Sequence, residues 1–453
     1  MNYENKKIIV AGAGKSGIAA ANLLGKMGAD ITLYDGNTEL DVAGVKSKLR
    51  FPDDVKIVLG EFTDEMVNSC ELFIISPGVP KDLDYVIKLE KAGVPIWGEA
   101  ELGYRFSKGR LAAITGTNGK TTTTALLGEI CKTQFESVFV VGNIGTPCTE
   151  VAEETRDDSV VVAEMSSFQL ESVEEFHPQV SMILNVTPDH LNRHHTMENY
   201  TEAKANIMLN QTPDETCILN YEDDRLRALA ERSKARVVFF SSIRELDEGI
   251  FVRGERIILK ENGSETDICS VHDMNIIGRH NHENAMAAIA GALSLGVSLD
   301  NIRLALKKFV AVEHRIEYTA TRNGVKYYND SKGTNPDASI QAVRAMSSPT
   351  VLIAGGFDKG SDYDEFIESF NGMIKHVLLM GATADKIALC CDKHGFHDYT
   401  FVKDMNEAVE KAYRLTEPGD AVLLSPCCAS WGMFKNYEER GRIFKELARA
   451  LPE

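Results

Sequence analysis

Two stretches of the sequence place a lysine and a hydroxyl residue directly behind glycines. Segment 10–21 (VAGAGKSGIAAA) and segment 112–124 (AAITGTNGKTTTT) each begin with an apolar run and continue into a helical pattern. Glycines let a backbone fold around phosphate oxygens, and the lysine adds positive charge. Both segments could therefore bind a nucleotide, although neither matches the complete G-x-x-x-x-G-K-[ST] pattern.

The second loop is the better candidate for a triphosphate. Lys120 offers a point charge to the terminal phosphates, and Thr121 offers a hydroxyl to Mg²⁺. Residues 121–124 are four consecutive threonines, which are poor helix formers, so their place at a helix start indicates that the N–H groups and hydroxyls there matter. We predict that ATP binds to Gly116, Thr117, Asn118, Gly119, Lys120, Thr121 and Thr122.

The first loop matches the dinucleotide fingerprint G-x-G-x-x-G. Its glycines are Gly12, Gly14 and Gly17, and Asp35 follows at the end of the next apolar run. If functional, this loop would hold nucleotide phosphates on backbone N–H groups at a helix N-terminus. A tight turn without a ligand, or a nicotinamide-dependent oxidoreductase or nucleotide-sensing protein, would give the same pattern.

The elements that must position these loops follow an α/β pattern. Short apolar runs alternate with helical stretches almost throughout, which predicts α/β layers with mostly parallel sheets. We predict three domains, at residues 1–98, 99–311 and 312–453. Strands are expected at 7–12, 30–35, 55–60, 71–76 and 94–97 in the first domain, and at 326–331, 350–356, 376–381 and 421–426 in the third.

Composition narrows the class of protein. The formal net charge of −18 disfavours a nucleic-acid partner, because an acidic surface repels a phosphate backbone. Nine cysteines without a C-x-x-C pair indicate reduced thiols rather than a disulfide framework. We saw no signal peptide, and the apolar runs are far shorter than the roughly 18 residues of a membrane span. We therefore expect a cytoplasmic protein without a membrane span.

Further motifs connect the second loop to a known family. They are GNIGTP (142–147), AEMSSFQL (163–170), NVTPDHLNRH (185–194), YTEAK (200–204), GRHNHENAMAA (278–288), EHRIE (313–317), YNDSKGTNPDA (328–338), AGGFDKG (354–360) and LLSPCCASWGMFKNYEERG (423–441). In this order, and over the whole chain, the sequence resembles the Mur ligases, whose ATP loop is shared with folylpolyglutamate synthases.

The resemblance implies a function and a fold. It implies a Rossmann-like N-terminal domain, a central P-loop ATPase-like domain, and a Rossmann-like C-terminal domain that binds D-glutamate and closes over ATP. It implies an ATP-dependent ligase of peptidoglycan precursor synthesis, hence of cell shape and division, that adds D-glutamate to UDP-N-acetylmuramoyl-L-alanine through an acyl phosphate. We expect a monomer. Another amino-acid-adding Mur ligase and a folylpolyglutamate synthase are the alternatives; the roughly 110 residues before the ATP loop favour a uridine-nucleotide substrate.

The resemblance also assigns substrate-binding residues. The uridine-diphosphate substrate would contact Lys15, Ser16, Asp35, Ser76, Pro77, Gly78 and Asn143. ATP would also contact Asn281, Arg315 and Asp330 from later in the chain. D-Glutamate would contact Thr334, Lys359, Ser430 and Tyr437, and Lys332 would meet the transferred phosphoryl group. Two departures from the family pattern are Gly333, where alanine is usual, and Trp431 beside Ser430.

The same resemblance implies two Mg²⁺ ions. Thr121 and Glu164 would hold one ion, and His190 the other. Lys204 is implied to be carbamylated by CO₂, which would convert a cation into an anion able to ligate or orient magnesium. The implied catalytic residues are Lys120, His190, Lys204 and Lys332.

Overall fold

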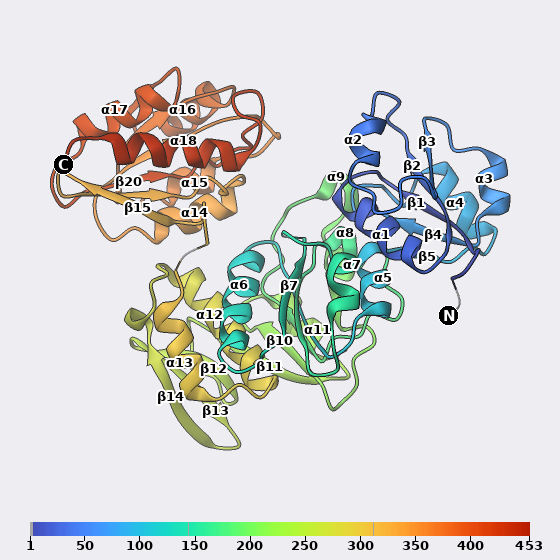
Figure 1. Cartoon of the computed structure of the whole chain (residues 1–453). Helices are drawn as coiled ribbons and strands as arrows, with labels where there is room; N and C mark the ends of the chain where they lie inside the picture. Colours follow the sequence, from blue (N-terminus) through green and yellow to red (C-terminus); the bar gives the residue numbers. More distant parts are fainter. Residues whose placement is uncertain (1–2, 144, 311) are drawn as a thin grey trace. The chain divides into compact units, whose positions relative to one another are not determined.

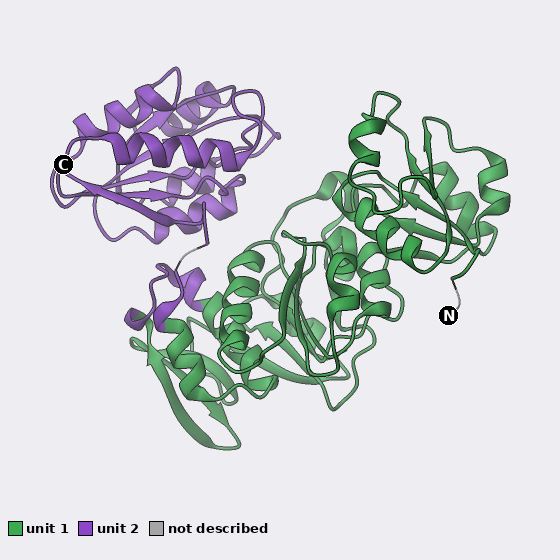
Figure 2. Cartoon of the chain, viewed as in Figure 1, with its two compact units in different colours: residues 1–271, 283–306 green, residues 272–282, 307–453 purple. Residues whose placement is uncertain are grey.

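The computed structural model describes residues 3–143, 145–310 and 312–453. The chain forms two compact units, residues 1–271 with 283–306 and residues 272–282 with 307–453 (Figure 2). The predicted boundary at residue 311 lies outside the described residues, and the boundaries at 98 and 311 stay predictions. The predicted α/β fold with mostly parallel sheets is confirmed.

The N-terminal sheet has five parallel strands in the order β3-β2-β1-β4-β5 (Figure 1). Along β1, Ile8 and Val10 pack into one core and Ile9 and Ala11 into another, so helices cover both faces. The order in which successive strands are added to the sheet reverses between β1 and β4, and open α/β sheets bind ligands at such a point. The elements are β1 (Lys7–Ala11), α1 (Lys15–Lys26), β2 (Asp30–Asp35), α2 (Val42–Lys46), β3 (Val55–Leu59), α3 (Asp64–Ser69), β4 (Leu72–Ile75), α4 (Asp84–Lys91), β5 (Ile96–Gly98) and α5 (Glu99–Phe106).

The central sheet has nine strands in the order β14-β13-β12-β11-β10-β9-β6-β8-β7. Strand β6 lies between β8 and β9, so the loops that follow these three parallel strands lie at one edge. The elements are β6 (Arg110–Thr115), α6 (Lys120–Lys132), β7 (Val138–Gly142), α7 (Cys148–Val151), β8 (Val160–Glu164), α8 (Ser167–Leu170), β9 (Val180–Ile183), α9 (Leu191–His194), α10 (Met197–Ala205), β10 (Thr216–Asn220), α11 (Asp224–Ala230), β11 (Arg236–Ser241), β12 (Gly249–Arg253), β13 (Arg256–Glu261), β14 (Ser264–Ser270), α12 (Arg279–Ser294) and α13 (Leu299–Lys308); 3₁₀ turns span Ala152–Glu154, Asn206–Met208 and Val271–Asp273.

The antiparallel edge β12-β13-β14 was not predicted from the sequence. The turn between β13 and β14 places Asn262 and Gly263 at φ +51° and +74°. An Asn-Gly pair with two positive φ angles is typical of a tight hairpin, so the sequence did carry a signal for it.

The C-terminal sheet has six strands in the order β15-β16-β20-β17-β18-β19, all parallel except β15. The carboxyl ends of β16, β20 and β17 are neighbours, because Asn329 pairs with Leu424 and Leu424 with Ile353. The elements are β15 (Glu317–Arg322), β16 (Val325–Asn329), α14 (Pro336–Arg344), β17 (Thr350–Ala354), α15 (Asp364–Glu368), β18 (Ile374–Leu379), α16 (Ala384–Lys393), β19 (Tyr399–Phe401), α17 (Met405–Leu415), β20 (Ala421–Leu424) and α18 (Tyr437–Ala450). Across the described residues, every helix is too short or too polar to cross a membrane.

Candidate active site

The second glycine loop joins β6 to α6 and is held in place from β9. Gly119 precedes α6 with φ +86°, a left-handed conformation that favours glycine. The Asn118 N–H donates to Asn185 Oδ1 at 2.8 Å, and the Thr117 N–H donates to the Asn185 carbonyl at 2.9 Å. Asn185, two residues after the end of β9, therefore fixes the loop from the neighbouring strand.

Two lysines meet at this loop. Lys120 Nζ and Lys204 Nζ each donate to the Gly116 carbonyl at 2.8 Å. Lys204 is buried, although it lies on a helix where a solvated lysine is the usual case, and its Nζ lies 4.5 Å from the centre of the Tyr200 ring. Burial, and then the charge of Lys120, lower the pKa of Lys204 well below its usual value.

Glu164 ends β8 beside the same loop, since it pairs with Ile114 of β6. Its side chain is 1% exposed, and Oε1 accepts from Asn143 Nδ2 at 2.8 Å. Its Oε2 is buried without a hydrogen-bond partner among the described residues. A buried, half-satisfied carboxylate and the hydroxyl of the buried Thr121 are oxygen donors of the kind that a hard cation prefers, so these residues fit Mg²⁺.

His190 lies at the start of α9 in the left-handed region, with φ +54°. Its ring is half-exposed and contacts the edge of the Phe168 ring, at 4.9 Å between ring centres. His190 Nε2 lies 3.6 Å from Asp189 Oδ2. The imidazole of His190 is therefore accessible to solvent.

The first glycine loop joins β1 to α1, and a carboxylate holds it. Asp35 Oδ2 accepts from the Ala13 N–H at 2.9 Å, and Ser76 Oγ donates to the Gly12 carbonyl at 3.4 Å. A Cβ at Gly17 would lie 1.8 Å from the Gly12 carbonyl oxygen, so only glycine fits there. Lys15 donates from Nζ to the Gly145 carbonyl.

The other residues predicted for the uridine nucleotide lie around this loop. Ser16 is half-buried in the first turn of α1, and Pro77 and Gly78 directly follow Ser76 after β4. Asn143, after β7, contacts Glu164 as described above. It thus lies beside the candidate metal carboxylate, and the Lys15 contact joins the first loop to the segment after β7.

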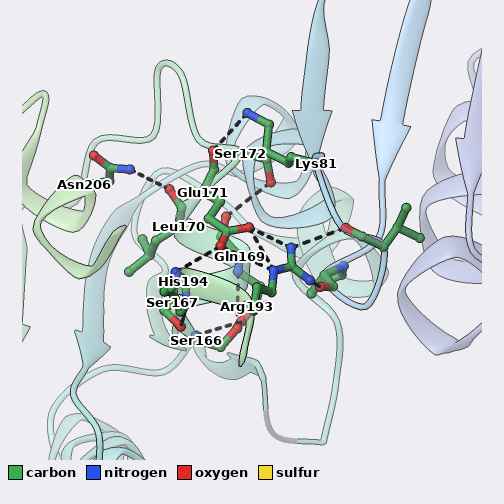
Figure 3. Close-up of polar contacts among 12 residues, drawn as sticks. Lys81, Ser166, Ser167, Gln169, Leu170, Glu171, Ser172, Arg193, His194 and Asn206 are labelled. Atoms are coloured by element: carbon green, nitrogen blue, oxygen red, sulfur yellow. Dashed lines mark hydrogen bonds and ion pairs between the residues drawn. The ribbon is translucent and has the colours of Figure 1, made fainter. Parts of the chain in front are cut away.

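Arg193 connects the two halves of this unit, as Figure 3 shows. Its guanidinium pairs with Glu171 at 2.6 Å and donates to the carbonyls of Pro77 and Val79 at 3.0 and 3.3 Å. His194 Nδ1 lies 3.3 Å from Glu171, and burial lowers the pKa of His194. The segment that carries His190 is thereby attached to the loop after β4.

In the C-terminal unit, Asp330 is buried at the end of β16. Its Oδ2 accepts from Ser425 Oγ at 2.7 Å, and its Oδ1 accepts from the Ile316 N–H at 3.3 Å. Burial raises the pKa of Asp330 to about 7. A Cβ at Gly333 would lie 2.4 Å from Asp330 Oδ2, so the glycine at this departure from the family pattern leaves room for the carboxylate.

Lys332 and Tyr437 lie together, with Nζ 5.2 Å from the ring centre. Ser331 Oγ donates to the Tyr437 carbonyl at 2.8 Å, and the buried Arg440 donates to the Ser331 carbonyl at 2.7 Å and to the Cys428 carbonyl at 3.1 Å. Arg440 thus holds the loops after β16 and β20 together.

Lys359, after β17, lies over Trp431, with Nζ 5.3 Å from the ring centre. Trp431 is 54% exposed and contacts the Phe357 ring at 5.5 Å between ring centres, whereas Ser430 is buried. Trp431, the second departure from the family pattern, therefore contacts Lys359, the lysine predicted to bind D-glutamate, at the protein surface.

Three predicted residues of this unit remain, and two of them adjoin the group just described. The Thr334 N–H donates to the Lys332 carbonyl at 2.9 Å, and the charge of Arg315 acts on Asp330. Thr334 is half-buried just before α14, whose N-cap is Asn335. Asn281 is buried in α12 and donates from Nδ2 to the Ile277 carbonyl at 2.7 Å, and the Arg315 N–H donates to the Val312 carbonyl at 3.0 Å.

The structure thus brings the predicted residues together in three groups. In the first unit, one group surrounds the loop after β1 and another surrounds Gly116; in the second unit, the third group lies at the ends of β16, β17 and β20. A single site made from all three stays a prediction. Sequence analysis assigned no role to Asn185, Arg193 or Arg440, although all three lie inside quoted motifs.

Three family descriptions match successive parts of the chain. "Mur ligase MurD-like, N-terminal domain" matches residues 6–98, "Mur ligase middle domain" matches 114–292, and "Mur ligase, glutamate ligase domain" matches 314–428.

Solved structures share this fold at low sequence identity. The UDP-N-acetylmuramate-alanine ligase MurC from Thermotoga maritima is 19% identical with a TM-score of 0.59, and covers 98% of this chain and 99% of its own. The MurF ligase from Thermotoga maritima, solved in complex with ADP, is 17% identical with a TM-score of 0.61, and the match covers 98% and 96% of the two chains.

Curated relatives are much closer in sequence. The UDP-N-acetylmuramoylalanine--D-glutamate ligase of Lachnoclostridium phytofermentans is 54% identical, and that of Lachnospira eligens is 52% identical, each over 100% of both chains. The enzyme of that name from a Thermoanaerobacter species is 47% identical over the same coverage. With these relatives and the three matched domains, the chain belongs to the Mur ligase family, as the sequence motifs predicted.

Proposed function

We propose that this protein is an ATP-dependent ligase that adds D-glutamate to UDP-N-acetylmuramoyl-L-alanine, giving ADP and phosphate. The identity of 54% over the whole chain to a ligase of that name supports the substrates. The observation that carries the chemistry is the pair of lysine side chains, Lys120 and Lys204, whose Nζ atoms meet at one carbonyl of a glycine loop beside a buried carboxylate.

The reaction has to overcome charge repulsion. The alanyl carboxylate of the substrate attacks the γ-phosphate of ATP, which gives an acyl phosphate and ADP; the amine of D-glutamate then attacks the acyl carbon and phosphate leaves. Two like charges about 4 Å apart repel by roughly 4 kcal/mol at an effective dielectric constant near 20. The carboxylate meets several such repulsions from the phosphates at once, so a fixed set of positive groups is needed to offset them.

The residues of the second loop supply part of that set. The N–H groups at the start of α6 and the Lys120 ammonium would bind the β- and γ-phosphates. Thr121 and Glu164 would hold one Mg²⁺ and His190 a second, and the metal would neutralise charge on the phosphates. The buried Glu164 oxygen that lacks a described partner supports this assignment.

Lys204 has the environment that carbamylation requires. Only a neutral amine attacks CO₂, and burial together with Lys120 favours the neutral form of Lys204. The nitrogen bonds to the carbon of CO₂ and loses a proton, which leaves an anion. ¹³C-bicarbonate should therefore give a carbamate signal in the NMR spectrum that Lys204→Ala lacks, and that variant should lose activity without rescue by bicarbonate. A Lys204→Ala enzyme with full activity would exclude the modification from the mechanism.

The two ends of the substrates would be held by different loops. Lys15, Ser16, Asp35, the segment 76–78 and Asn143 would bind the uridine-diphosphate substrate. Thr334, Lys359, Ser430 and Tyr437 would bind D-glutamate, Lys332 the phosphoryl group, and Asn281, Arg315 and Asp330 the rest of ATP. The C-terminal domain would close over ATP, and scattering profiles with and without an ATP analogue and substrate should differ.

One assay tests the proposal directly. Phosphate release from ATP is measured with UDP-N-acetylmuramoyl-L-alanine and, in turn, D-glutamate, L-glutamate, glycine and meso-diaminopimelate. Release that depends on D-glutamate is expected; release that depends on another amino acid would replace the proposed acceptor. The match of residues 6–98 to the MurD-like N-terminal domain disfavours a folylpolyglutamate synthase. Cytoplasmic location and the monomeric state remain predictions.

A further inference from the structure

Helices α15 and α16 of the C-terminal unit carry a second set of reactive side chains. Asp364 and Glu368 lie four residues apart on α15, and Cys390 and His394 lie four residues apart at the end of α16. Residues at i and i+4 share one face of a helix. The ligand atoms of Asp364, Cys390 and His394 all lie within 4.8 Å of one another.

The distances approach those of a tetrahedral metal site. His394 Nε2 lies 2.7 Å from Asp364 Oδ1, and Cys390 Sγ lies 3.3 Å from the same oxygen. Tetrahedral zinc with its usual bond lengths sets N···O and S···O separations of about 3.4 and 3.6 Å. An outward shift of less than about 1 Å would therefore admit the ion between these side chains.

We propose that Asp364, Cys390 and His394 form a zinc site whose fourth position is open to water. A thiolate with an imidazole suits Zn²⁺, whereas Mg²⁺ and Ca²⁺ prefer oxygen ligands only. Glu368 lies 3.8 Å from His394 Nδ1, the ring nitrogen that would remain protonated. Carboxylates at that place commonly orient a metal-binding histidine.

Metal binding must displace a lysine and a proton. Lys393 Nζ contacts both Asp364 oxygens at 2.8 Å, but its side chain is 65% exposed, so this ion pair is weak. Burial and the Asp364 carboxylate raise the pKa of Cys390 to about 12. On binding, Cys390 Sγ exchanges its proton for Zn²⁺, the proton passes to solvent, and the Lys393 ammonium returns to water.

The charges around the thiol set the pH dependence. Asp362 and Asp364 face the thiol from the α15 side, and Lys393 and His394 face it from α16. Because binding releases the thiol proton of Cys390, zinc affinity should rise with pH.

Cys390 also provides a local readout. All nine cysteines are free and lie among the described residues, and Cys390 alone is not buried. In the folded chain, a thiol reagent should therefore label Cys390 first. Bound zinc should slow that labelling without any contribution from ATP or the ligase substrates, so the outcome is independent of the proposed function.

The experiment uses the full chain after chelator treatment, with excess Mg²⁺ present. Zinc should slow alkylation of Cys390 at least tenfold and raise Tm by a few degrees. His394→Ala and Asp364→Asn should weaken this protection at least tenfold, whereas His397→Ala, an exposed histidine paired with Asp392, should not. Melting curves without zinc confirm that each variant folds.

Substitution of Lys393, which competes with zinc for Asp364, is the most specific test of the site. Lys393→Ala should tighten zinc binding several-fold, because it removes the cation that occupies Asp364. Lys386→Ala is the matched control, since Lys386 lies on the same helix but pairs with Asp358 at 3.4 Å. Equal labelling of Cys390 with and without zinc, or equal zinc protection in the wild type and His394→Ala, would overturn the proposal.

Discussion

The two glycine loops of the first unit follow the same sequence pattern but meet opposite charges. Asp35, a carboxylate, accepts from the Ala13 N–H of the loop after β1. The Nζ atoms of Lys120 and Lys204 converge on the Gly116 carbonyl of the loop after β6. The Asp35 carboxylate offsets part of the positive potential that would attract a phosphate to the first loop, whereas the Lys120 side chain adds positive potential to the second. The difference indicates that only the second loop is suited to a triphosphate.

The glycines of the two loops are also needed for different reasons. Gly17 allows a close approach of α1 to the backbone of β1, since a Cβ there would lie 1.8 Å from the Gly12 oxygen. Gly119 adopts φ +86° at the start of α6, which favours glycine whatever the available space. Similar sequence patterns thus satisfy a packing constraint in one loop and a backbone constraint in the other.

The largest expected effect is at Lys120. Lys120→Ala should lower kcat about 10³-fold, because it removes a cation at the phosphate that is transferred. The rate of phosphate release from ATP measures this change in kcat. Lys132→Ala is the matched control, because Lys132 lies at the other end of α6 and is half-exposed. If kcat of Lys120→Ala stayed within tenfold of the wild-type value, the second loop would not be the one that binds the transferred phosphate.

Gly17→Ala tests the packing constraint of the first loop. The added methyl should push α1 away from β1 and lower the free energy of unfolding by about 1–3 kcal/mol. Gly14→Ala, three residues away, should change it little, since a Cβ at Gly14 meets nothing within 4 Å. Urea denaturation compares the two variants, and equal stabilities would mean that the close approach is unimportant.

Lys15→Ala should separate the ligands of the two loops. Loss of a charged hydrogen bond to a phosphate should raise KM for the uridine-diphosphate substrate roughly 10–100-fold and leave KM for ATP unchanged. Lys26→Ala, at the far end of the same helix, should leave both unchanged. Steady-state kinetics with each substrate varied distinguishes them. A rise in KM for ATP alone would reverse the assignment of the two loops.

Arg193→Ala should have the smallest effect, because it acts through position. It frees the segment after β4 from α9, so KM for the uridine-diphosphate substrate should rise about three- to tenfold, with kcat less affected. Lys81→Ala is the matched control. It removes a 3.3 Å hydrogen bond to the carbonyl of Glu171, the residue that also pairs with Arg193, and should change KM less than twofold. Equal effects of the two substitutions would show that Arg193 has no special role there.

The local pattern of apolar residues was enough to predict many of the strands. The apolar runs of the first and third domains coincide with β1–β5 and with β16, β17, β18 and β20. The β12–β14 edge was missed, although Asn262-Gly263 marks its turn, because its strands are half-polar and do not form apolar runs. The contacts of Asn185, Arg193 and Arg440 were missed because they bind carbonyls or amides 67 to 116 residues away.

The sequence by itself determined the two glycine loops and the residue types beside them, because turn geometry and charge are local properties. Only the tertiary structure decided that Lys204 is buried and donates to a carbonyl 88 residues earlier in the chain. It also decided that Lys120 is its neighbour. The protonation of an amine depends on solvent exposure and nearby charge, and folding alone sets both.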